Sequence, residues 1–288
     1  MIRSFFLFIF LCTGFLATAQ QGLQQFTPSI LFDKGSWEFK SYQNLYSQQS
    51  AFGDSPLEKV NTERGRETFF TSINQFSFGL NDRINFGLDV WVKHVNLENG
   101  DFRTRTAISG IGPRIKIAPF RQLPRFSIQS TFLFPLADDL EGRAPDAEQP
   151  FLFLETDRSL WLSQLFYDVP ISSKWQLFFQ QAFWYNIVRE SFRENNFLQT
   201  QTSVFVSYFP TSRWTIFGMT EYFPTHYNDS NQSGELSFSY FVQSGAGLKY
   251  QLIPNLLELE TLYTNFWAGS AGNGAGYTIN FGIRVIRQ

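Results

Sequence analysis

The side chains best suited to covalent catalysis are scarce in this 288-residue chain, which has two histidines and one cysteine. His226 stands near Asp229 and Ser230, and His94 stands in "WVKHVNLENGD". A Ser–His–Asp relay needs nucleophile, base and orienting acid in hydrogen-bond contact, which neighbours within one short loop rarely achieve. Outer-membrane phospholipases carry His and Ser two positions apart, and "HVN" lacks the serine. We therefore predict ordinary polar histidines and no catalytic residue.

The segment 137–158 is rich in carboxylates, which suit Ca²⁺. Its acids do not follow the regular Asp-x-Asp-x-Asp-Gly spacing of a calcium loop, so we expect a solvated acidic loop and neither metal nor cofactor. The same segment contains "PFLFLET" at 150–156, which is too apolar to lie in water. This run either extends the strand that follows it or folds inward as a constriction, and we favour strand extension.

Many charged and amide side chains stand on alternate positions between apolar residues. In "INFGLDVWV", Phe86 and Leu88 alternate with Asp89, and in "GYTINFGIRVI", Ile283 and Val285 flank Arg284. A β-strand places alternate residues on opposite faces. We predict that the polar face lines an interior lumen and could contact a solute. The lumen candidates are Asp89, Lys93, Arg114, Lys116, Gln129, Gln180, Glu221, Lys249, Glu258, Glu260 and Arg284.

Segments of this kind recur along the whole chain and are joined alternately by tight turns and by longer polar loops. This alternation is typical of bacterial outer-membrane barrels, which have short periplasmic turns and long outer loops. We expect β-bulges in 67–79 and 159–169, where the apolar pattern is poor. The predicted strands are 36–46, 67–79, 84–95, 104–118, 125–136, 159–169, 174–188, 197–209, 213–223, 237–251, 256–266 and 276–286.

The composition fits the same architecture. Aromatic residues make up 18% of the chain, yet its mean hydropathy is −0.18 and no mature segment could form a transmembrane helix. Residues 1–19 have the charged start, apolar run and small-residue site of a cleaved secretory signal. We predict an all-β fold, a single twelve-stranded antiparallel transmembrane β-barrel over 20–288, closed by pairing of 276–286 with 36–46. A secreted β-sandwich, with its apolar faces as core, is the alternative.

Aromatic residues near the strand ends favour the membrane barrel, because interfacial girdles of this kind flank its apolar band. We expect one girdle at each end. The periplasmic set is Trp37, Trp175, Tyr208, Trp214 and Tyr250, and the outer set is Trp161, Trp184, Tyr222, Trp267 and Tyr277.

The whole mature chain resembles transporter-type outer-membrane barrels of Gram-negative bacteria, particularly of the Bacteroidota. Its ending "AGYTINFGIRV" is similar to the closing strand of the phenol-degradation-pathway outer-membrane family. That resemblance implies passage of small, often apolar compounds, and it assigns no individual site residue.

These observations predict an outer-membrane channel or transporter that passes a small solute passively and performs no covalent chemistry. The expected partners are outer-membrane lipid, the outer-membrane assembly machinery and the solute. The near-neutral charge, 22 basic against 25 acidic residues after signal removal, gives no sign of nucleic-acid binding. The alternatives are a structural or accessory barrel acting through its loops, as a complex subunit or adhesin, and a lipid-modifying barrel enzyme.

Overall fold

The structure is a computed structural model and describes residues 29–63, 65–99, 104–138, 152, 154–189, 196–228 and 236–287. The predicted signal, residues 1–19, lies outside this range, as do Asp229, Ser230 and most of the acidic loop. In the described part of the chain, no helix is long and apolar enough to cross a membrane.

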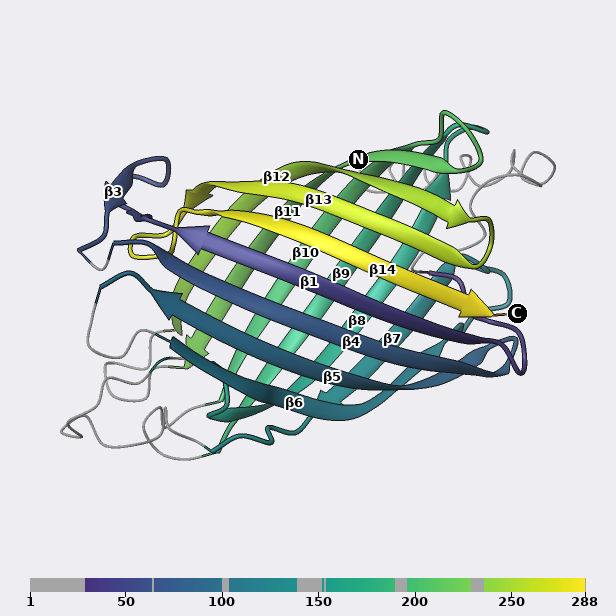
Figure 1. Cartoon of the computed structure of the whole chain (residues 1–288), viewed down its shortest axis with the longest axis horizontal. Coiled ribbons are helices and arrows are strands. Elements are labelled where there is room, and N and C mark those ends of the chain that lie inside the picture. The colour runs from purple at the N-terminus through teal and green to yellow at the C-terminus, as the bar shows by residue number, and fades with distance from the viewer. Residues whose placement is uncertain are drawn as a thin grey trace, which may run out of the picture.

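Among the described residues, twelve strands form one closed antiparallel barrel, and two short strands form a separate hairpin (Figure 1). The predicted all-β fold and its twelve strands are confirmed, with end points that differ by a few residues. The barrel strands are β1 (Trp37–Gln48), β4 (Glu67–Asn81), β5 (Ile84–Leu97), β6 (Thr104–Ile117), β7 (Phe126–Leu133), β8 (Arg158–Pro170), β9 (Trp175–Val188), β10 (Phe197–Tyr208), β11 (Trp214–Asn228), β12 (Leu236–Ile253), β13 (Leu257–Gly269) and β14 (Tyr277–Arg287). The hairpin, β2 (Ser50–Phe52) and β3 (Lys59–Asn61), lies in the loop between β1 and β4.

The barrel closes where its first strand meets its last. Strand β1 pairs with β14 from Trp37↔Arg287 to Ser47↔Tyr277, and its other edge pairs with β4. Each barrel strand among the described residues therefore pairs with two neighbours, and closure of this kind is the condition for a sheet to lie in hydrocarbon. We call this junction of β1 and β14 the seam. The tight turns lie at the same end as the C-terminus, the short-turn end, and the hairpin lies at the opposite, long-loop end (Figure 1).

The two faces of the sheet differ in the way the sequence predicts. Phe86, Leu88 and Phe281 each expose about half of their surface on the outside of the barrel, at 51%, 45% and 45%. Their strand neighbours Asp89 and Arg284 are buried inside. A β-sandwich would bury its apolar face instead. The closed topology and the apolar exterior therefore rule out the sandwich and are those of an outer-membrane barrel.

Exposed tryptophans stand near both ends of the barrel, with Trp175 and Trp214 at the short-turn end and Trp161 and Trp267 at the other. The indole Nε1 of Trp161 donates to Ser130 Oγ at 2.8 Å, and that of Trp267 to Ser244 Oγ at 3.1 Å. Small outward hydroxyls therefore satisfy the polar edge of these indoles.

Trp184 does not belong to the outer girdle. Its ring lies inside the barrel, packed edge-on against Trp91 with centroids 5.9 Å apart. The exposed neighbours Phe183 and Tyr185 occupy the outward positions instead. The run Phe183-Trp184-Tyr185 is aromatic throughout, so the sequence pattern does not show which residue points outward.

The predicted bulge in 159–169 is wrong, because β8 pairs with β7 and β9 without a register shift. The alternation is poor there because Leu160 and Leu162 face inward, in a cluster with Trp91 and Leu133. Strand β4 does have an irregularity, at its short-turn end between Gly79 and Asn81.

Candidate functional site

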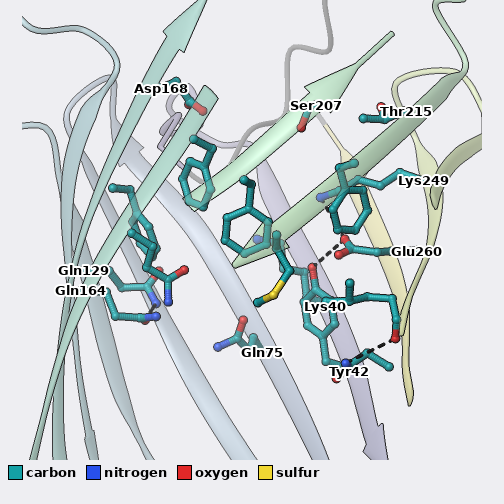
Figure 2. A pocket seen from close by; sticks show the side chains of 18 of the residues that line it. Lys40, Tyr42, Gln75, Gln129, Gln164, Asp168, Ser207, Thr215, Lys249 and Glu260 are labelled. Carbon is teal, nitrogen blue, oxygen red and sulfur yellow. Dashed lines mark hydrogen bonds and ion pairs between the residues drawn. The ribbon is translucent and has the colours of Figure 1, made fainter. Parts of the chain in front are cut away.

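The interior of the barrel contains a cavity of about 460 Å³ in its short-turn half, which we call the inner chamber. Among the sequence-predicted lumen residues, Arg114, Lys116, Gln129, Gln180, Glu221, Lys249 and Glu260 line it. Asp89, Glu258 and Arg284 are buried behind this lining, and Lys93 lies nearer the long-loop end. Figure 2 shows Gln129 and Gln164 on one side of the chamber and Lys40, Tyr42, Lys249 and Glu260 on the other.

A charged arc spans the chamber wall from β12 through the seam to β6. At its centre, Arg284 of β14 forms ion pairs with Glu38 of β1 and, at 3.8 Å, with Glu258 of β13. Lys40 Nζ lies 3.2 Å from the other oxygen of Glu38. These side chains are largely buried, so each charge is held by a neighbour of opposite sign rather than by bulk water.

The same pattern continues on both sides of the seam. Arg114 Nη1 lies 3.2 Å from Asp89 Oδ1, and Gln75 Nε2 donates to the second oxygen of Asp89 at 2.8 Å. On the other side, Lys249 Nζ lies 2.9 Å from Glu260 Oε2, which also accepts the Tyr42 hydroxyl at 3.2 Å. The charged arc is thus a set of compensated pairs.

An aromatic arc forms the facing wall, with one phenylalanine from each of β8, β9, β10 and β11. The ring centroids are 5.9 Å apart for Phe166 and Phe178, 5.4 Å for Phe178 and Phe205, and 6.3 Å for Phe205 and Phe217. These spacings are those of interacting aromatic pairs. The sequence pattern does not reveal this row, because the contacts depend on strand register.

A hydrogen-bonded belt connects the arcs at mid-height. Glu221 of β11 accepts from Gln201 Nε2, Ser203 Oγ and Gln243 Nε2 at 2.6, 2.9 and 2.6 Å. No lysine or arginine among the described residues forms an ion pair with it. The belt continues from Gln243 across β13 and β14 to β1 through Thr264, Thr278, Asn280 and Asn44.

The segment that precedes β1 enters the short-turn end of the lumen. Ser29 Oγ donates to Asp168, Phe32 N donates to Asn85 Oδ1 at 3.3 Å, and Lys116 Nζ donates to the carbonyl of Ile30 at 2.8 Å. The Phe32 ring packs in a buried pair with Ile286. This segment therefore narrows the inner chamber at its short-turn end, a contact that no local pattern predicts.

A second cavity of about 530 Å³, the outer chamber, lies on the long-loop side. Lys93, Trp91 and Trp184 contribute to its wall. Tyr42, Asn44 and Asn280 line both chambers, so the two cavities adjoin at this waist.

The segment before β8 folds over the outer chamber. Leu152 and Leu154 are buried against Val95, and Arg105 Nη1 donates to the Leu152 carbonyl at 2.8 Å. Glu155 forms an ion pair with Lys93. The favoured strand extension is wrong, because β8 begins only at Arg158. Burial of leucines against inward residues favours the constriction instead.

The two histidines lie apart. His94 Nδ1 lies 2.7 Å from Thr106 Oγ1. The prediction that His226 lies in a loop is wrong, because this residue belongs to β11. The centroid of its ring lies 5.4 Å from that of Phe238. Among the residues that the structure describes, no group of three or more His, Cys, Asp or Glu is placed to hold a metal ion.

Comparisons with known proteins identify the fold. No family model matches the chain, and no curated protein matches it. A solved COG4313 outer-membrane channel from Pseudomonas putida F1 has a TM-score of 0.65 at 11% identity, covering 92% of this chain and 100% of the other. A KdgM porin gives a TM-score of 0.42 at 11% identity, with 86% and 99% covered. The first similarity shows that the barrel architecture of an outer-membrane channel is shared.

Proposed function

We propose that the protein is an outer-membrane channel through which a small solute passes passively, without covalent chemistry. The observation that carries the proposal is the pair of adjoining chambers inside a closed barrel, with polar groups at their waist. Polar linings and constrictions are what select solutes in such pores. The segments 29–36 and 154–157 narrow the two ends, which favours a selective channel over a general pore.

The waist gives a sharp test. Asn44 lines both chambers, whereas Gln43, the residue before it in β1, points to the outer face. We expect the purified protein to conduct ions in a planar bilayer and Asn44→Trp to reduce that conductance severalfold. Gln43→Trp is the matched control and should conduct like the parent protein. Absence of conductance, together with absence of solute flux in liposomes, would overturn the proposal.

A structural or accessory barrel is the second candidate, because the compensated charges could also serve only to fill the interior. That reading predicts no flux and no effect of Asn44→Trp beyond stability. The same measurement therefore decides between the two.

We also propose that residues 1–19 are removed on export and that the outer-membrane assembly machinery inserts the barrel. Sequencing of the mature protein's N-terminus should begin at Gln20. The similarity of the closing strand to the phenol-degradation-pathway family remains a prediction.

A further inference from the structure

We propose that the inner chamber binds a neutral, polyhydroxylated ring compound, of the chemical class of mono- and disaccharides. This inference rests on the proposed function and specifies its solute. Three features of the chamber carry it: the aromatic arc, the many amide side chains and the partners that already hold its cationic side chains.

The aromatic arc offers the apolar half of such a site. Phe166, Phe178 and Phe217 line the chamber and form, with Phe205, an unbroken row over four adjacent strands. Aromatic faces carry partial negative charge and attract the partly positive C–H groups of a ring that packs on them. A sugar ring has such a C–H face, whereas its rim carries hydroxyls.

The chamber also offers polar groups that suit hydroxyls. A side-chain amide both donates and accepts hydrogen bonds, as a hydroxyl does. The amide side chains of the lining are those of Asn44, Gln75, Asn85, Gln129, Gln164, Gln176, Gln180, Gln201, Gln243 and Asn280.

The cationic side chains that line the chamber already have partners, which disfavours an anionic solute. Lys40, Arg114 and Lys249 each have a carboxylate partner within 3.2 Å. Lys116 donates to the Ile30 carbonyl, and Asp168 accepts from Gln176 at 2.6 Å. An anionic solute would have to compete with these buried pairs, and separating a buried pair is strongly unfavourable.

A wholly apolar solute fits the chamber poorly for a different reason. It would displace the water that hydrogen-bonds to the amide groups of the lining and would offer these groups no hydrogen bonds in return. Burial of each unsatisfied amide group costs free energy. The cavity volume of about 460 Å³ lies within the range of small-molecule sites. Size, amides and aromatic wall together favour a compact neutral polyol ring.

Isothermal titration of the detergent-solubilised protein with maltose, glucose, benzoate and toluene tests the proposal directly. We expect maltose or glucose to bind, and Phe178→Ala with Phe205→Ala to weaken that binding about tenfold. Phe179→Ala is the matched control, because Phe179 is the exposed neighbour on the lipid-facing side and its loss should leave binding unchanged. Heat-modifiable gel migration verifies that each variant is folded.

If the double variant does not fold, Gln180→Leu replaces it, because it removes a lining amide with little change in volume, and it should also weaken sugar binding. Tighter binding of benzoate or toluene than of either sugar would overturn the inference, as would no sugar binding at all. Conductance without sugar binding defeats this inference and leaves the channel intact. Sugar binding without conductance or flux defeats the channel and leaves the binding site.

Discussion

The charged and aromatic arcs face each other across one chamber, yet they stand on different parts of the barrel. The charged arc crosses the seam, where β1 and β14 meet without a connecting turn, and Arg284, Glu38 and Glu258 link three adjacent strands there. The aromatic arc spans β8 to β11, strands that follow one another along the chain. We infer that the charges stabilise closure of the barrel, whereas the phenylalanines mainly shape the passage.

The largest effect should follow from breaking the charged arc at the seam. Arg284→Ala leaves the carboxylates of Glu38 and Glu258 without their shared cation, and removing one partner of a buried pair typically costs about 3–5 kcal/mol. We expect the temperature at which the folded gel band converts to the unfolded one to drop markedly. Arg284→Lys retains the charge, so its transition temperature should lie between that of the parent protein and that of Arg284→Ala. An unchanged transition temperature for Arg284→Ala would contradict a stabilising role.

A substitution at the border between the two arcs should have a smaller effect on stability than Arg284→Ala, and it should also change the conductance. A Cβ at Gly247 would lie 2.4 Å from Phe217 Cζ and 2.5 Å from the Thr261 carbonyl oxygen. Gly247→Ala must therefore displace the ring or the neighbouring strand, and overpacking of this kind costs about 1–3 kcal/mol. We expect a lower transition temperature and altered conductance in planar bilayers.

Gly218→Ala on β11 provides the control for this substitution, because the nearest atom to its added Cβ is 3.8 Å away. It should behave like the parent protein. Equal effects of the two substitutions would mean that the position of the Phe217 ring is not what limits the passage.

How far the sequence predicts these arcs depends on how regular its alternation is. The strands and their closure follow from clean patterns, such as that around Phe86, Leu88 and Asp89, which fix the outward face without tertiary information. Trp184 was misplaced because its neighbours are also aromatic. The row of phenylalanines depends on register between strands, and the inward fold of Leu152 depends on the distant residue Val95. The row leaves no local signal, and the apolar run at 150–156 indicates burial without deciding between strand extension and constriction.

Glu221 separates two roles of charge in the lumen, because a carboxylate can stabilise the barrel or select the ions that pass through it. It lies beside the aromatic arc and is held by amides and a hydroxyl rather than by a cation. Glu221→Gln should lower stability by about 1.5–3 kcal/mol, the net worth of a hydrogen bond to a charged group, because it replaces one acceptor oxygen by a donor. Because a fixed negative charge in a pore favours cations, reversal-potential measurements under a salt gradient should show weaker cation preference.

Glu260→Gln is the counterpart of that variant in the charged arc. It leaves Lys249 without its carboxylate and should lower stability as well as cation preference. If Glu221→Gln destabilised the barrel as much as Glu260→Gln does, the two arcs would not differ in the way inferred here.

The smallest effect on stability is expected far from both arcs, at the long-loop end. Lys93 and Glu155 form an ion pair there, but the Glu155 side chain is 45% exposed, and exposed pairs contribute about 0–1 kcal/mol. Glu155→Gln should therefore leave the transition temperature nearly unchanged. Because Glu155 lines the outer chamber and its ion pair connects 154–157 to β5, releasing it should raise single-channel conductance. A large loss of stability without any change in conductance would mean that this segment stabilises the barrel rather than restricting its mouth.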